Sequence, residues 1–152
     1  MKTFIQMVEE TSKTISEIMP WDLEEKLEST TPPMLVDIRE PYEFDAMHIK
    51  DSISAPRGIL ETACEFNFEE TIPELASARD QEIVVICRSG NRSVLAAAVM
   101  QELGYQDVAS LKTGLRGWND YEQVMVNNSN ESVDIELADE HFSVKLRPEQ
   151  EA

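Results

Sequence analysis

A cysteine and two arginines in one short segment are the residues of this chain best suited to carry out a reaction. Cys87 follows the apolar run 82–86 and precedes the alanine-rich run 94–103. The segment that it opens reads Cys87, Arg88, Ser89, Gly90, Asn91, Arg92 and Ser93. A cysteine between a strand and a helix start lies where free backbone N–H groups and the helix dipole stabilise anions. The segment therefore predicts a thiolate at Cys87 that acts as a nucleophile.

The residues around Cys87 are those expected of an anion-binding loop. Backbone N–H groups of residues 88–93 can form a nest around the sulfur, and Gly90 allows a positive φ and a close backbone approach. Arg88 and Arg92 are predicted to lie at contact range of the sulfur and to offset its negative charge. A buried cysteine that acts only as a small apolar side chain is the alternative. It does not explain Arg, Gly, Arg and Ser so close to a helix start.

Short apolar runs alternate along the chain with segments of helical spacing. Strands are predicted at 14–18, 34–38, 52–55, 82–86 and 108–111. Helices are predicted at 21–28, 41–47, 59–66, 72–78, 94–103 and 115–121. This alternation predicts an α/β fold with a central, mostly parallel sheet flanked by helices on both faces.

The two ends of the chain differ from this core. Residues 1–13 are predicted to be an N-terminal arm, either a short helix packed on the body or a frayed segment, and residues 14–126 to be the domain. Residues 127–152 are predicted to be a C-terminal extension. Apolar residues alternate over 133–137 and again over 142–146, which indicates a β-hairpin.

The balance of acidic and basic residues and the number of cysteines indicate which kinds of partner and compartment to expect. With 13 basic and 30 acidic residues the formal net charge is −17, which argues against nucleic acid and anionic membrane as partners. No signal core or membrane-spanning run is evident, and two cysteines do not make a disulfide scaffold, so a reducing cytoplasm is expected. No His/Cys cluster has metal-ligand spacing, so no metal site is expected.

Four segments in order resemble the rhodanese family of sulfurtransferases, over residues 15–121. The segment 87–93 is similar to the active loop of single-domain members. The others are residues 35–44 continued by His48-Ile49, then 103–105, then 113–118. Met47 and Asp51 stand where the family usually has glycine, which concerns local turn geometry and not the chemistry of the cysteine loop.

The resemblance implies a rhodanese-like fold and a two-step reaction at Cys87. The thiolate would take the outer sulfur of a small anionic donor such as thiosulfate, and the persulfide would pass it to cyanide, a thiol or a protein acceptor. Arg88 and Arg92 would bind the donor while the loop amides stabilise the terminal sulfur. The substrate-binding residues are then expected to be Arg88, Ser89, Gly90, Asn91, Arg92 and Ser93.

Residues outside the loop have weaker claims to the site. Asp37 and Arg39 are expected to form a structural ion pair that braces the loops. Arg57 could reach the pocket or lie on the surface. His48 is expected to be structural. Cys64 is expected to be a packed bystander, although it could resolve an oxidised or persulfidated Cys87.

Three other functions use some of the same features. A non-enzymatic rhodanese-like binding module would often lack the cysteine that this chain keeps. A cysteine-dependent phosphatase or arsenate reductase places its arginine one position further from the cysteine than Arg92, which follows Cys87 by five positions. The shorter loop favours a sulfur atom over a tetrahedral phosphate. A protein that relays persulfide to another protein would differ only in its acceptor.

Overall fold

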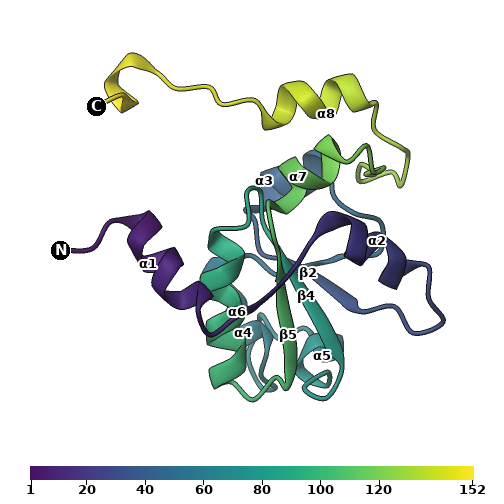
Figure 1. Cartoon of the computed structure of the whole chain (residues 1–152). Helices are drawn as coiled ribbons and strands as arrows, with labels where there is room; N and C mark the ends of the chain where they lie inside the picture. Colours follow the sequence, from purple (N-terminus) through teal and green to yellow (C-terminus); the bar gives the residue numbers. More distant parts are fainter.

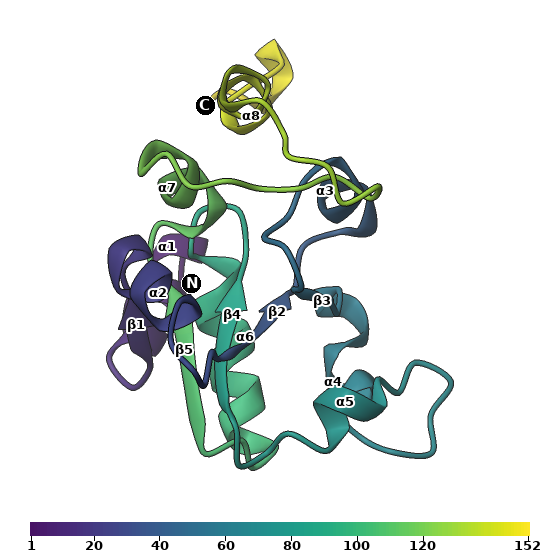
Figure 2. The same ribbon diagram turned by 90° about the vertical axis from the view of Figure 1, so that its right-hand side faces the viewer.

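A five-stranded parallel sheet forms the centre of the protein, which a computed structural model describes over residues 1–152 (Figure 1). The strands are β1 (Ser16–Ile18), β2 (Met34–Asp37), β3 (Ile53–Ser54), β4 (Glu82–Ile86) and β5 (Asp107–Leu111). All neighbours pair in parallel, in the order β1-β5-β4-β2-β3, which Figure 2 shows from left to right. The predicted parallel sheet is therefore confirmed.

Helices cover both faces of this sheet. They are α1 (Phe4–Ser12), α2 (Pro20–Leu27), α3 (Pro41–Ala46), α4 (Leu60–Ala63), α5 (Pro73–Ala76), α6 (Arg92–Glu102), α7 (Gly114–Asp120) and α8 (Ile135–Phe142), with short 3₁₀ turns η1 (Arg57–Ile59) and η2 (Pro148–Gln150). None of them is both long enough and apolar enough to span a bilayer.

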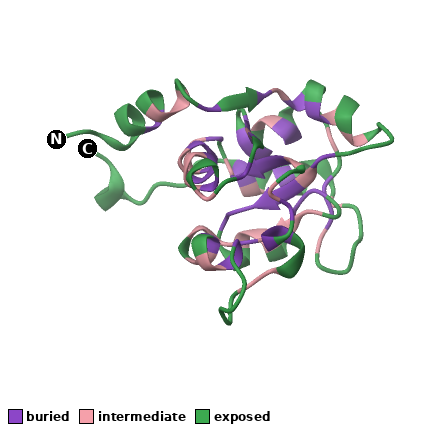
Figure 3. Ribbon diagram, turned by 90° about the horizontal axis from the view of Figure 1, so that it is seen from below, coloured by how far each residue is buried: buried purple, intermediate pink, exposed green.

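The central strand β4 separates two apolar layers. Ile83 and Val85 pack with residues of α1, α4, α5 and α6, whereas Val84 and Ile86 pack with residues of α2, α7 and α8. Side chains of a strand point alternately to opposite faces, so a strand buried on both sides must be apolar throughout. Figure 3 shows the resulting distribution, with buried residues mainly in the central strands and exposed ones on the outer helices and the tail.

The C-terminal β-hairpin prediction is wrong, because residues 135–142 form helix α8. Ala138 and Phe142, four positions apart, are each 2% exposed, whereas Leu137 is 57% exposed. That spacing places the two buried side chains on one helical face. The residues between the two alternating runs, 138–141, also contain no Gly or Asn, which a tight hairpin turn requires.

The N-terminal residues form the short packed helix that was one of the two expectations. Thr3 and Gln6 make a capping box, in which Gln6 N donates to Thr3 Oγ1 (3.1 Å) and Thr3 N donates to Gln6 Oε1 (2.9 Å). Val8 joins the apolar layer that contains α6. Helix α1 therefore lies beside α6, whose first two residues belong to the cysteine loop (Figure 1).

Candidate active site

Cys87 lies directly after β4, and two backbone N–H groups point at its sulfur. Gly90 N is 3.1 Å and Ser93 N is 3.3 Å from Cys87 Sγ. The residue is 1% exposed, so water does little to weaken these contacts. Ser93 is the second residue of α6, so one of the two donors is an unpaired N–H of a helix start. The site is thus built to hold negative charge on sulfur.

Two glycines allow the loop to fold closely against the turn between β5 and α7. Gly90 has φ +85°, and a Cβ there would lie 2.9 Å from Thr113 N. Gly114 has φ +60°, and a Cβ there would lie 2.5 Å from the carbonyl carbon and oxygen of Arg88. Both positions therefore demand glycine for its backbone conformation and for space.

The start of α7 holds the carbonyl side of the same loop. Leu115 N donates to Cys87 O and Arg116 N donates to Arg88 O, each at 2.9 Å. These carbonyls satisfy N–H groups that would otherwise be unpaired at the helix start. The loop peptides therefore direct their carbonyls to α7 and leave N–H groups to face the sulfur.

A pair of buried hydroxyls continues from the sulfur into the sheet. Cys87 Sγ is 3.2 Å from Ser93 Oγ, and Ser93 Oγ is 2.7 Å from Ser110 Oγ on β5. Ser93 and Ser110 have no exposed surface. Ser110 was not among the residues predicted for the site, although a serine within the apolar strand β5 is a visible break in the pattern.

The pocket at Cys87 is small, with a volume of about 210 Å³. It is lined by Phe4, Cys87, Arg88, Ser89, Asn91 and Arg92. The structure thus brings together the predicted loop residues at one cavity, with Gly90 and Ser93 behind the sulfur. Phe4, from α1, was not expected there. Its side chain gives the cavity one apolar wall beside two cationic side chains.

Each arginine of the pocket already has a protein partner. Arg92 Nη2 lies 3.2 and 3.4 Å from the two carboxylate oxygens of Glu43 on α3. Arg88 Nη2 donates to the backbone carbonyls of Phe142 (2.9 Å) and Ser143 (3.0 Å), at the end of α8. Neither partner was foreseen from the sequence. Both arginines are therefore held in place beside the sulfur before any substrate binds.

Asp37 and Arg39 form a buried ion pair at the end of β2. Arg39 Nε and Nη2 donate to the carboxylate of Asp37 at 2.8–3.2 Å, and both side chains are 1% exposed. Arg39 Nη2 also donates to Met47 O at 2.7 Å. Asp37 pairs in register with Ile86, the residue before Cys87. The ion pair thus braces the end of the strand beside the cysteine loop.

Arg57 and Cys64 lie apart from this arrangement. Arg57 Nη1 is 3.1 Å from Glu61 Oε1, and Arg57 does not line the pocket at Cys87. Cys64 is completely buried, and this burial raises the pKa of its thiol, which favours the neutral form. The structure therefore does not bring Arg57 to the sulfur, and its role in substrate binding stays a prediction.

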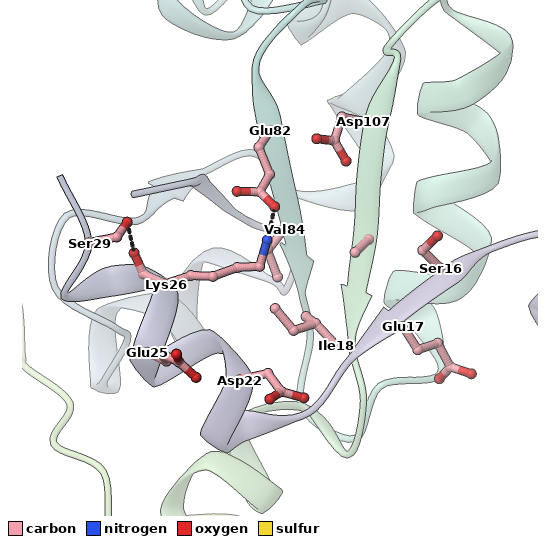
Figure 4. A pocket seen from close by; sticks show the side chains of 11 residues that line it. Ser16, Glu17, Ile18, Asp22, Glu25, Lys26, Ser29, Glu82, Val84 and Asp107 are labelled. Carbon is pink, nitrogen blue, oxygen red and sulfur yellow. Dashed lines mark hydrogen bonds and ion pairs between the residues drawn. The ribbon is translucent and has the colours of Figure 1, made fainter. Parts of the chain in front are cut away.

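A larger pocket of about 590 Å³ lies across β1, β5 and β4 (Figure 4). Its charged lining is mostly acidic: Glu17, Asp22, Glu25, Glu82 and Asp107, with Lys26 bonded to Glu82. It contains none of the residues 87–93, and its carboxylates would repel an anionic substrate. The smaller pocket at Cys87 is therefore the candidate active site.

The family model and the relatives found by comparison with known proteins point to one family. A family model described as a rhodanese-like domain matches residues 19–121. A putative mitochondrial thiosulfate sulfurtransferase of Schizosaccharomyces pombe is 32% identical over 90 residues, which cover 57% of this chain and 63% of that protein. A sulfurtransferase of Allochromatium vinosum is 32% identical over 104 residues, covering 68% and 88%. The chain thus spans somewhat less than two thirds of the first relative.

Solved structures agree on the fold. A Rhodopseudomonas palustris protein of unknown function, described as a possible tyrosine phosphatase, has a TM-score of 0.68 and 29% identity. The match covers 80% of this chain and 92% of that one. Helices α1 and α8 lie outside the residues 19–121 that the family model matches.

Proposed function

The chain belongs to the rhodanese-like family, and from this premise we propose that it is a sulfurtransferase that carries a sulfane sulfur on Cys87. The observation that carries the proposal is the pair of N–H groups, from Gly90 and Ser93, directed at Cys87 Sγ. Preorganised donors of this kind stabilise charge where a reaction develops it. Here they would stabilise both the thiolate and the persulfide that it forms.

The first half-reaction would load the enzyme. Cys87 thiolate attacks the outer sulfur of thiosulfate, so that a bond forms between Sγ and that sulfur while the S–S bond of thiosulfate breaks. Sulfite leaves with the electron pair of the broken bond. Arg88 and Arg92 would offset the negative charge of the donor at the pocket of about 210 Å³, a volume suited to a small anion.

The second half-reaction would unload the enzyme. A nucleophile such as cyanide attacks the terminal sulfur of the persulfide, and thiocyanate leaves while Cys87 returns as the thiolate. A thiol or a protein cysteine would react in the same way. No metal or organic cofactor takes part in either step. Both cysteines are free thiols, and we propose a reducing, cytoplasmic setting in which Cys87 stays available.

Turnover with two substrates tests this function against its alternatives. We expect the protein to form thiocyanate from thiosulfate and cyanide, and to leave an aryl phosphate unhydrolysed. The loop places Arg92 five positions after Cys87, one fewer than in phosphatase loops, which is why we expect no phosphate chemistry. Phosphate release that depends on Cys87, without thiocyanate, would favour the phosphatase. Absence of both reactions and of any persulfide would favour a binding module.

Arg92→Ala is expected to lower kcat/KM for thiosulfate by about 10- to 150-fold, because a charge-assisted hydrogen bond to the donor contributes about 1.5–3 kcal/mol. The matched control is Arg147→Ala, since Arg147 is exposed and its guanidinium bonds Glu149 in the C-terminal tail. Steady-state kinetics at constant ionic strength measures both variants. Equal effects of the two substitutions would remove Arg92 from the donor site.

A further inference from the structure

The end of helix α8 contacts Arg88 of the cysteine loop, although the helix lies outside the family-matched residues 19–121. The carbonyls of Phe142 and Ser143 accept hydrogen bonds from Arg88 Nη2 at 2.9 and 3.0 Å. Arg88 also lines the pocket at Cys87. The last turn of α8 therefore holds a side chain of the cysteine loop, as its place above α7 in Figure 1 allows.

Two kinds of contact dock α8 on the domain. Ala138 and Phe142 are buried in the apolar layer that includes residues of α7. Asn119 Nδ2, at α7, donates to Asp139 Oδ1 at 2.5 Å. Helix α7 in turn donates to the loop carbonyls of Cys87 and Arg88. The cysteine loop, α7 and α8 thus form one connected unit.

The charges around the Arg88 guanidinium leave it able to bind an anion. The last carbonyls of a helix have no intrahelical partner and carry partial negative charge, so they attract a guanidinium. They occupy only one nitrogen of Arg88, and a guanidinium has five N–H donors. Burial and the cations Arg39 and Arg88 lower the pKa of His141. His141 is therefore uncharged near neutral pH and does not compete with Arg88 as a cation.

We propose that α8 is a positioning element of the donor site, which acts by holding Arg88 in the orientation that binds the anionic sulfur donor. The proposal rests on the sulfurtransferase function. With α8 undocked, the long Arg88 side chain would regain its rotamer freedom, and donor binding would have to order it again. Docking of α8 would then raise donor affinity without itself touching the donor.

Donor binding to the full-length Cys87→Ser variant tests this without turnover. Calorimetric titration with thiosulfate is expected to give a Kd about 3- to 10-fold higher when Phe142→Ala is added, since that change removes the side chain that docks α8. Asp139→Ala, which removes the bond from Asn119 without opening the core, is expected to act in the same direction. The matched control is Leu137→Ala on the exposed face of α8, with an unchanged Kd.

Coupling to Arg88 separates positioning from general loosening. In an Arg88→Ala background, Phe142→Ala and Asp139→Ala are expected to cause no further loss of affinity. In the protein with Cys87 intact, they should lower kcat/KM for the donor and leave kcat/KM for cyanide unchanged, because each constant reports one half-reaction of a ping-pong scheme.

Three outcomes would overturn the proposal. They are an unchanged Kd in both α8 variants, a loss of equal size with and without Arg88, and a gain in affinity, which would mean that α8 withholds Arg88 from the donor. A failed sulfurtransferase function gives a different result. In that case the wild-type protein would form no persulfide with thiosulfate, whatever the coupling between α8 and Arg88.

Discussion

Cys87→Ser is expected to abolish the gain of about 32 Da, one sulfur atom, that wild-type protein shows by intact-mass spectrometry after incubation with thiosulfate. Serine keeps the size of the side chain but provides a hydroxyl, which is a far weaker nucleophile than a thiolate and cannot hold a sulfane sulfur. The two N–H groups that face Cys87 Sγ at 3.1 and 3.3 Å cannot compensate for this change. They stabilise the persulfide only after the side chain at position 87 has formed a bond to the sulfur of the donor. Thiocyanate formation should fall to background in the same variant.

Cys64→Ser is the matched control for this experiment. Cys64 is the other cysteine of the chain, is completely buried, and has a thiol whose pKa is raised by that burial. We expect Cys64→Ser to gain the same mass as wild type and to lose it on treatment with a reducing agent. A mass gain that persists in Cys87→Ser would show that the sulfur is carried elsewhere.

Asp37→Ala is expected to lower the free energy of unfolding by about 3–5 kcal/mol, because it leaves the guanidinium of Arg39 buried without its counter-charge. Arg39 is 1% exposed, so water cannot replace the carboxylate. Its remaining side-chain partner is the carbonyl of Met47. Equilibrium denaturation in urea measures the change, provided that the slope of the transition stays constant.

Two further variants identify the cause of that destabilisation. Glu61→Ala breaks the half-exposed pair with Arg57 and should cost less than about 1 kcal/mol. Asp37→Leu combined with Arg39→Met removes both charges and should recover part of the stability lost in Asp37→Ala. Similar losses in Asp37→Ala and Glu61→Ala would contradict the buried-pair explanation.

Local patterns carried enough information to predict the fold. The apolar run 82–86 is followed by Cys87 and then by an alanine-rich helix, and the structure shows strand β4, the loop and α6 in that order. Such runs are strands because both faces of a parallel sheet are covered. Alternation of strands with helices then fixes the architecture. The β-hairpin prediction was wrong for residues 135–142 because two patterns overlap there. Apolar residues alternate as in a strand, but Ala138 and Phe142 also stand four positions apart, as on one face of a helix.

The partners of the loop arginines could not be predicted because they depend on tertiary structure. Arg88 binds backbone carbonyls, one of them 54 positions away, and a carbonyl has no sequence signature. Phe4 reaches the pocket only because α1 folds back beside α6. Arg57 is a contrasting case, since Glu61 stands four positions later and the i, i+4 spacing was visible in the sequence.

The hydroxyls of Ser93 and Ser110 give the hydrogen-bond chain at the sulfur a direction that can reverse. With Cys87 as a thiol, S–H donates to Ser93 Oγ (3.2 Å), which in turn donates to Ser110 Oγ (2.7 Å). With Cys87 as a thiolate, Ser110 donates to Ser93 and Ser93 donates to the sulfur. Because a hydroxyl both donates and accepts, two bond rotations accomplish the change and no heavy atom moves. The two hydroxyls can therefore bond either form of the sulfur with the buried side chains left in place.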